Sequence, residues 1–511
     1  MSMRSSAARA IVMALVPVAL VAPLCATAQN PTPRTTKSSG SGAPPGLAAI
    51  READLRRDMD ALAGDAMRGR EAGTLDELRA SAWLAERARA AGLEPAGDDG
   101  TYFQFWPMRR AVTSPASRAA YDGTRLDLDT EAVVATPVDA TIDGAVLAVA
   151  TGTTPESSAA KGKVLVTTLR APADLAGRTK RNDTFIYTLL GLFAEVGRLS
   201  KLEAAAIIVV CDSIADAGFQ FPSTWMHRGE YGIDSVGVRG GAPNAGSPVI
   251  LVRRAPGQRI ASASRFTATL IADRFTQAGV NVIGRLRGTD PKLRDEYVLF
   301  SAHQDHDGVR FPTNGDSIWN GADDNASTSV ALLAIARAWK QHPGRRSALF
   351  VWHGAEERGL LGSRYHAAHP VVPITSIVAV VNGDMIGRNN PDTASLLGSQ
   401  PPHRNSAALV RMAIDANARV SHFAIDSLWD RPAHPEGFYF RSDHVPYAER
   451  NVPSIFFTTV LHDIYHTPFD EPSRIEYPKL TRMAKWMYAT GWAVSEARER
   501  PAIDVGYKFS R

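Results

Sequence analysis

Apolar runs and amphipathic helical segments alternate along the C-terminal half of the chain. Each apolar run is four to six residues long and bounded by polar or turn-forming residues, as expected of a buried strand. Between the runs lie helical segments, most clearly at 326–340, where Val330 and Leu333 recur on one face. The alternation predicts an α/β fold with a mainly parallel, helix-covered sheet. The predicted strands are 282–286, 297–302, 348–352, 377–381 and 455–458.

The pattern is different nearer the N-terminus. Residues 47–92 carry apolar positions at helical spacing and predict two helices, the second ending at Gly92. Residues 130–255 contain short β-branched runs separated by Gly, Pro and Asn, which predict a small β-rich unit. The predicted order is therefore a helical N-terminal part (47–129), a β-rich unit (130–255), the region of alternating strands and helices (256–500) and a C-terminal tail (501–511).

Residues 1–28 have the pattern of a cleaved signal peptide. Arg4 and Arg9 precede an apolar run, and small residues close the segment at 26–28. A membrane anchor is the alternative, but the run is shorter than the roughly 20 residues of a spanning helix, and prolines interrupt it. We therefore expect export to a periplasm or beyond the cell, with no membrane insertion after cleavage.

The residues that follow the signal, 29–46, are rich in Pro, Ser, Thr and Gly and predict a flexible linker. Cys25 raises a second alternative, lipidation, although the bulky Leu24 precedes it. Cleavage would remove Cys25 and leave Cys211 as the only cysteine, so no disulfide framework is expected.

Charge gives no indication of a polyanionic partner. The formal net charge of the 511 residues is +4, and loss of Arg4 and Arg9 would leave +2. Such a balanced surface is not typical of proteins that bind nucleic acids or anionic membranes. The hydrophobic fraction of 44% is that of an ordinary globular protein.

Candidate metal ligands follow the predicted strands. Twelve of the thirteen histidines lie between His303 and His466, within the region of alternating strands and helices. Side chains just beyond the carboxyl ends of parallel strands converge at one edge of a sheet. Two imidazoles and three carboxylates occupy such positions, and this mixture suits Zn²⁺ and related ions. The five residues are His303, Asp324, Glu357, Asp384 and His466.

Two further observations concern this site. Three carboxylates and a bridging hydroxide balance two divalent cations, whereas one cation would leave buried excess negative charge. Asp305 lies two residues after His303, so in an extended chain its carboxylate could accept the proton of the ring nitrogen that His303 does not give to a metal.

The motifs together resemble the co-catalytic di-zinc aminopeptidases, a family whose fold is shared by glutamate carboxypeptidase, glutaminyl cyclase and the transferrin receptor. The resemblance covers roughly residues 47–500, and the segments 161–164 and 204–207 extend it to an inserted protease-associated domain. It implies that residues 47–129 and 256–500 form the peptidase domain and that residues 130–255 are inserted into it. The motifs are 303–305 (HQD), 321–327 (GADDNAS), 356–360 (EERGL), 382–385 (NGDM), 442–444 (SDH) and 465–468 (YHTP).

The resemblance implies a role for each residue. His303 and Asp384 would hold one zinc ion, Glu357 and His466 would hold the other, and Asp324 would bridge them. Glu356 would be the general base, and Tyr465 would help to stabilise the oxyanion. The implied activity is hydrolysis of the N-terminal peptide bond of peptides by a hydroxide that two Zn²⁺ ions activate. Asp307 and the long segment 309–319 depart from the family pattern.

Other functions on the same fold stay open at this point. A glutaminyl cyclase would need a single zinc, and a carboxypeptidase would need cations for a free carboxylate, for which Arg388 and Arg441 are candidates. A non-catalytic receptor-like domain is a third alternative. The sequence indicates neither the preferred N-terminal residue nor the oligomeric state.

Overall fold

The computed structural model describes residues 42–170, 181–234, 238–239 and 246–510. The predicted signal peptide at 1–28 and the predicted linker as far as residue 41 lie outside the described residues. From residue 43 onward the chain forms one compact unit. Pro45 accepts a hydrogen bond from the Tyr488 hydroxyl at 2.6 Å, so this unit begins slightly before residue 47. Within the described ranges, every helix is too short or too polar to form a membrane span.

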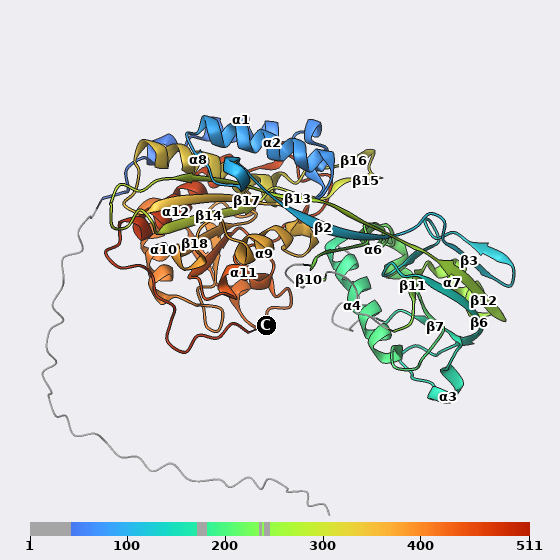
Figure 1. Ribbon diagram of the computed structural model, residues 1–511. Helices are drawn as coiled ribbons and strands as arrows, with labels where there is room; N and C mark the ends of the chain where they lie inside the picture. Colours follow the sequence, from blue (N-terminus) through green and yellow to red (C-terminus); the bar gives the residue numbers. More distant parts are fainter. Residues whose placement is uncertain (1–41, 171–180, 235–237, 240–245, 511) are drawn as a thin grey trace, which may run out of the picture. The chain divides into compact units, whose positions relative to one another are not determined.

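The larger of the two main sheets carries the parallel strands that the apolar runs predict (Figure 1). Its four central strands are mutually parallel, in the order β17-β14-β18-β21. Each is buried along most of its length, which is why it appears in the sequence as a continuous apolar run. These strands are β17 (Ser347–His353), β14 (Tyr297–His303), β18 (Ile377–Gly383) and β21 (Ser454–Thr458).

The outer strands of this sheet differ from the expectation, because many of their pairings are antiparallel. β2 (Phe103–Thr113) and β13 (Ala272–Leu286) form a long antiparallel ribbon, and β13 also pairs antiparallel with β17. On the other side, β19 (Thr393–Leu397) runs antiparallel to β21 and parallel to β20 (Ala424–Asp426). The predicted α/β class is confirmed, while the sheet as a whole is mixed.

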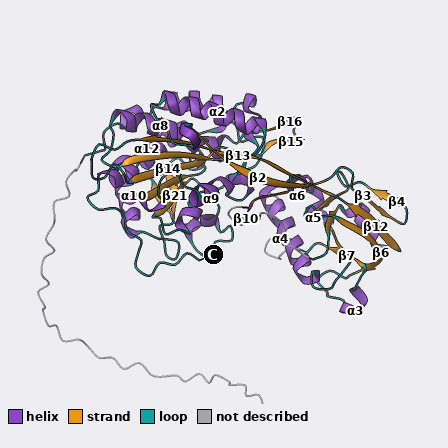
Figure 2. Ribbon diagram, viewed as in Figure 1, coloured by secondary structure: helices purple, strands orange, loops and turns teal. Residues whose placement is uncertain are grey.

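Helices cover both faces of this sheet (Figure 2). Alternate residues of a strand point to opposite faces, so Phe300 and Ala302 of β14 belong to one apolar cluster and Leu299 to another. The first cluster includes side chains of five helices, and the second includes side chains of α9 (Leu361–Ala368) and α11 (Val445–Ala448). The five helices are α1 (Glu52–Leu62), α2 (Leu75–Ala90), α8 (Thr328–Gln341), α10 (Ala407–Val420) and α12 (Tyr477–Glu496).

A second sheet of eight strands is inserted between β2 and β13. It extends past the expected limits of 130 and 255, because β3 and β12 pair with each other and β12 also pairs with β6. Two helices of this inserted unit, α4 (Arg181–Leu199) and α6 (Gln220–His227), matter below. The strands are β3 (Arg118–Tyr121), β4 (Thr124–Leu126), β5 (Ala132–Val134), β6 (Ala140–Ala148), β7 (Val164–Thr168), β8 (Ala206–Val210), β11 (Val249–Val252) and β12 (Arg265–Leu270).

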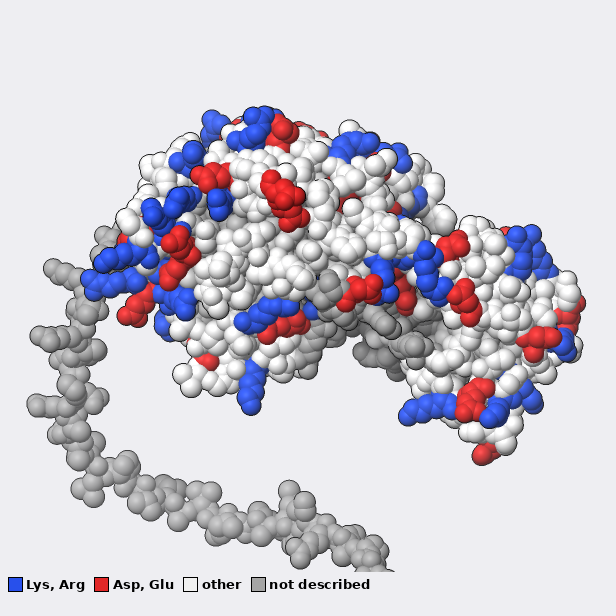
Figure 3. Space-filling model, in the orientation of Figure 1, with Lys and Arg blue, Asp and Glu red and all other residues white. Residues whose placement is uncertain are grey.

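Acidic and basic side chains are interspersed over the face of the molecule shown in Figure 3. On that face, neither sign of charge gathers into a large continuous patch. The absence of a nucleic-acid partner stays a prediction from composition.

Candidate metal centre

The five predicted ligands lie together beyond the carboxyl ends of the parallel strands. His303 is the last residue of β14, Asp384 follows β18, and Glu357 lies four residues beyond the end of β17, in the short helical turn Glu356–Arg358. Asp324 belongs to the helical turn Ala322–Ser327 that leads into α8, and His466 follows β21. Segments far apart in sequence therefore meet because the parallel strands all end at one edge of the sheet.

Asp324 lies at the middle of this group. Its Oδ1 atom is 3.2 Å from Nε2 of His303, and its Oδ2 atom is 3.0 Å from Nε2 of His466. The two oxygens of one buried carboxylate thus face two different imidazoles. This is the arrangement that a bridging carboxylate requires.

The remaining candidates divide between the two histidines. Nε2 of His303 lies 3.4 Å from Oδ1 of Asp384, and Nε2 of His466 lies 3.2 Å from Oε1 of Glu357. Donor atoms within 4.8 Å of one another form two groups among the described residues. One contains His303, Glu356 and Asp384, and the other contains His306, Asp324, Glu357 and His466.

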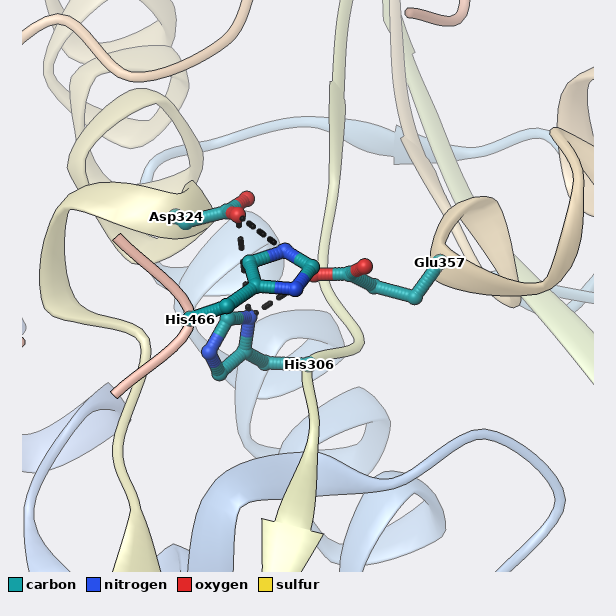
Figure 4. A group of neighbouring side chains, drawn as sticks. All are labelled: His306, Asp324, Glu357 and His466. Atoms are coloured by element: carbon teal, nitrogen blue, oxygen red, sulfur yellow. Dashed lines mark hydrogen bonds and ion pairs between the residues drawn. The ribbon is translucent and has the colours of Figure 1, made fainter. Parts of the chain in front are cut away.

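His306 is a member that the sequence reasoning missed (Figure 4). Its Nδ1 atom lies 2.9 Å from Oε1 of Glu357 and 3.9 Å from Oδ2 of Asp324. The available signal was a second histidine and an additional acid in the segment HQDHD at 303–307. Whether this second histidine reaches the site depends on how the chain turns after β14.

The predicted hydrogen bond between the ring of His303 and the carboxylate of Asp305 is not formed. Nδ1 of His303 lies 3.1 Å from the backbone carbonyl oxygen of Asp305, while the nearest carboxylate oxygen is 3.8 Å away. The carboxylate instead accepts the backbone N–H groups of Glu356 at 3.0 Å and Glu357 at 3.3 Å. The strand ends at His303, so the extended geometry assumed for 303–305 does not apply. Asp305 positions the two glutamates.

Glu356 and Tyr465 line the cavity in front of this group. Burial raises the pKa of Glu356 well above its usual value, and the neighbouring Asp384 and Asp443 add to the effect although His303 opposes it. Burial also raises the pKa of Tyr465, so its hydroxyl stays protonated. That hydroxyl accepts a hydrogen bond from Arg441 at 3.0 Å. The cavity wall therefore offers one carboxyl group able to exchange a proton and one phenol able to donate a hydrogen bond.

The loops that carry His303 and Asp324 are held by Arg70, a second residue that the sequence reasoning missed. Its fully buried guanidinium donates to the carbonyl oxygens of Gln304 at 2.7 Å, Asn320 at 2.7 Å and Gly321 at 2.9 Å. Burial lowers the pKa of Arg70 to about 10, which still leaves it charged at neutral pH. One side chain thus fixes the backbone on both sides of the site.

Gly321 is required by close packing at the same place. Its φ is +60°, and a Cβ atom there would lie 2.2 Å from the carbonyl oxygen of Asp324 and 2.4 Å from the ring of His306. A side chain at this position would displace residues of the site.

The site opens into a cavity of about 1030 Å³. Glu356, Glu357 and His466 line it from the segments that follow the strands of the larger sheet, and side chains of α4 and α6 line it from the inserted unit. Much of the lining is apolar, including Trp225, Trp429, Phe440 and Leu461 among others. A group of metal ligands thus lies beside a space large enough for a small peptide.

The donor set fits divalent cations. Asp324, Glu357, Glu356 and Asp384 bring four carboxylates into a buried region, which is costly unless positive charge compensates it. Carboxylate oxygens and imidazole nitrogens in such a mixture are ligands of zinc and of similar borderline ions. The donors form two separate groups, and Asp324 faces a histidine of each, an arrangement that fits two cations better than one.

Comparison with known families matches part of the chain. Residues 281–491 match the model of peptidase family M28, a range that includes all five predicted ligands. "Aminopeptidase YwaD" of Bacillus subtilis is 26% identical over 264 residues, which are 50% of this chain and 53% of the relative. "Leucine aminopeptidase 2" of Arthroderma otae is 24% identical over 227 residues, or 43% of this chain and 42% of the relative. The matches span about half the length of these relatives or less.

Solved structures share the fold over most of the chain. An aminopeptidase from Aneurinibacillus sp. strain AM-1 superposes with a TM-score of 0.58 and 15% identity, covering 90% of this chain and 98% of that one. BSAP, described as a zinc aminopeptidase from Bacillus subtilis, superposes with a TM-score of 0.57 and 17% identity, covering 90% and 99%. These comparisons confirm the predicted α/β fold and the predicted resemblance to zinc aminopeptidases, while the protease-associated character of the inserted unit stays a prediction.

Proposed function

We propose that this protein is a zinc-dependent aminopeptidase, because residues 281–491 match the model of peptidase family M28. The observation that carries the proposal is the position of Asp324, whose two carboxylate oxygens face His303 and His466 separately. The names of the relatives and of the similar structures support the same activity.

In this proposal five side chains hold two zinc ions. His303 and Asp384 bind the first, Glu357 and His466 bind the second, and Asp324 binds both. When bound there, zinc supplies Lewis-acid activation of water and of the scissile carbonyl group. His306 contacts Glu357 and restrains its carboxylate.

The chain supplies the proton transfers and the binding of the substrate. Glu356 accepts a proton from the attacking water and delivers it to the departing amine, which requires a carboxyl group that changes protonation near the working pH. Burial of Glu356, which raises its pKa, suits this task. The Tyr465 hydroxyl, held by Arg441, donates to the oxyanion that develops on the carbonyl.

Selection of a free N-terminus follows from the negative charge of the metal centre beside the cavity. Glu356 lines the cavity and Asp384 belongs to the same donor group, and their carboxylates attract a protonated α-amine and repel a free carboxylate. Arg441, a candidate for binding a carboxylate, already donates to Glu436 at 2.8 Å and to Tyr465 at 3.0 Å. Arg388, the other candidate, donates to the carbonyl oxygen of Arg474 and does not line the cavity. An aminopeptidase is therefore supported better than a carboxypeptidase.

Three further parts of the proposal rest on the sequence. The signal pattern at 1–28 supports export to a periplasm or the exterior. The motifs at 161–164 and 204–207 support a protease-associated character for the inserted unit. The complete set of five ligands supports two zinc ions, in place of the single ion of a glutaminyl cyclase.

Hydrolysis of blocked dipeptides tests the proposal. The purified protein is expected to release the N-terminal residue of C-blocked dipeptides and of amino-acyl amides, and to leave N-blocked dipeptides intact. Activity should disappear on chelation and return with zinc. Cleavage of N-blocked dipeptides alone would favour a carboxypeptidase, and release of a cyclised N-terminal glutamine would favour a glutaminyl cyclase.

A further inference from the structure

The inserted unit reaches the metal centre through one arginine. Arg228 immediately follows α6, and its side chain is buried. Its guanidinium forms an ion pair with Oδ1 of Asp307 and donates to the backbone carbonyl oxygen of Asp307 at 3.3 Å. Asp307 lies between the end of β14 and the hairpin of β15 (Gly308–Thr313) and β16 (Asp316–Trp319), where the sequence departs from the family pattern.

Asp307 in turn contacts His466. The side chain of Asp307 is almost fully buried, and its Oδ2 atom lies 3.4 Å from Nδ1 of His466. Its Oδ1 atom is shared between Arg228 and Nη2 of Arg358, the latter at 3.4 Å. The carboxylate is thus held between two guanidinium groups on one side and an imidazole on the other.

The two nitrogens of His466 therefore have different partners. Nε2 faces Asp324 and Glu357, while Nδ1 faces Asp307. A carboxylate on the second ring nitrogen of a metal-binding histidine fixes its tautomer and its orientation, and raises its basicity as a ligand. His303 is arranged differently, because its Nδ1 atom has the backbone carbonyl of Asp305 as its partner. Among the described residues, the nearest partner of Nδ1 is thus a carboxylate for His466 and a backbone carbonyl oxygen for His303.

We propose that Arg228 and Asp307 are positioning residues for His466, so that the inserted unit sets the affinity of one of the two metal ions. The inference rests on the proposed function for the presence of two ions. Arg228 holds the Asp307 carboxylate against Nδ1 of His466, and its fork of donors reaches both the carboxylate and the backbone of the same residue. The same helix, α6, places Trp225 in the wall of the cavity. The inserted unit thus contributes to the substrate space and to the metal centre through one element.

Metal affinity of the full chain provides the test. Zinc is titrated into metal-stripped wild type, Arg228→Gln, Arg228→Lys, Asp307→Ala and His466→Ala in the presence of a competing chelator, which gives a dissociation constant for each ion. Arg228→Gln and Asp307→Ala should weaken the binding of one ion by about 10-fold or more and the binding of the other by less than about 2-fold. The weakened ion should be the one that His466→Ala loses. Arg228→Lys keeps the charge but lacks the fork, so its affinity should lie between those of the wild type and Arg228→Gln.

Two matched controls separate positioning from general damage. Trp225→Ala removes a cavity side chain of the same helix, and Arg253→Gln removes an arginine that pairs with Asp216 inside the inserted unit. Both controls should keep both zinc affinities. The inference is overturned if Arg228→Gln and Asp307→Ala leave both affinities within 2-fold of the wild type. It is also overturned if these two variants lose affinity for both ions equally, or if Trp225→Ala reproduces their effect.

The outcome is independent of catalysis, because binding is measured without substrate. If the wild type binds two ions and Arg228→Gln weakens one of them, the inference holds even when no peptide is hydrolysed. In that case only the proposed aminopeptidase activity fails. If the wild type binds fewer than two ions, the proposed two-zinc centre fails first, and the inference fails with it.

Discussion

Oδ1 of Asp324 lies 3.2 Å from Nε2 of His303. The other oxygen of the same carboxylate lies 3.0 Å from the ring of His466, so Asp324 is the only side chain common to both halves of the centre in our account. Replacement of Asp324 by Asn removes a negative charge that both cations share, and we expect the affinity of both ions to fall together. By contrast, His303→Ala should weaken mainly the binding of the ion that His303 shares with Asp384. Metal content measured against free zinc concentration gives the comparison, and retention of two tightly bound ions by Asp324→Asn would rule out the bridge.

Glu356→Gln tests the assignment of the base. The substitution preserves the shape of the side chain but removes its ability to accept a proton, so turnover of an amino-acyl amide should fall by at least ~10²-fold. Bound zinc should stay unchanged, because Glu356 acts as a base and Glu357 as a ligand. Glu357→Gln is the matched control and should lower zinc affinity. Loss of zinc from Glu356→Gln would identify Glu356 as a ligand.

Arg70→Met tests how the loops of the site are held. The substitution leaves buried carbonyl groups of Gln304, Asn320 and Gly321 without their donor. We expect the free energy of unfolding to fall by about 3 kcal/mol or more, with weaker zinc binding. Arg79→Met, at a half-exposed arginine of α2, is the control and should cost less than about 1 kcal/mol. Equal effects of the two substitutions in urea denaturation would refute the role of Arg70.

Buried His366 should make the stability depend on pH. Burial lowers the pKa of His366 to about 3, and its Nδ1 atom lies 2.6 Å from the Tyr447 hydroxyl oxygen. Between pH 6.5 and pH 3 the unfolded chain binds a proton that the folded chain does not. The free energy of unfolding should therefore decrease as the pH falls, with a contribution from this group of up to about 1.4 kcal/mol per pH unit.

His366→Asn isolates this contribution, because the variant lacks the titrating group. The stability difference between wild type and variant should shrink as the pH falls from 6.5 towards 3. Effects common to both proteins, including release of metal, cancel in this difference. A difference that is constant over this range would show that His366 titrates normally in the folded state.

Residues attached to strand ends could be predicted from the sequence. His303 and Asp384 close apolar runs, and parallel strands bring such positions together whatever the connections between them. Asp324 and Glu357 could be predicted in the same way, because each lies in a segment that comes after a predicted strand and leads into a helix. The orientation of the outer strands could not be predicted in this way, because β2 and β13 pair across an insertion of more than 150 residues.

Contacts that depend on loop geometry could not be predicted from the sequence. Asp305 turns its carboxylate to the backbone of Glu356 and Glu357 because the chain leaves the strand conformation after His303. Arg228 comes from the inserted unit, and no local pattern connects it with Asp307. His306 reaches Glu357 for the same reason, through a turn that the spacing of residues does not specify.

The central claim is a peptidase centre that works with two zinc ions, and zinc titration of the metal-stripped protein tests it most directly. The rate of hydrolysis of a leucine amide is followed as a function of the number of zinc ions bound per chain. Our account predicts a rate that continues to rise after the first ion and becomes constant at two ions per chain. A rate already maximal at one ion, or no hydrolysis with two ions bound, would contradict it.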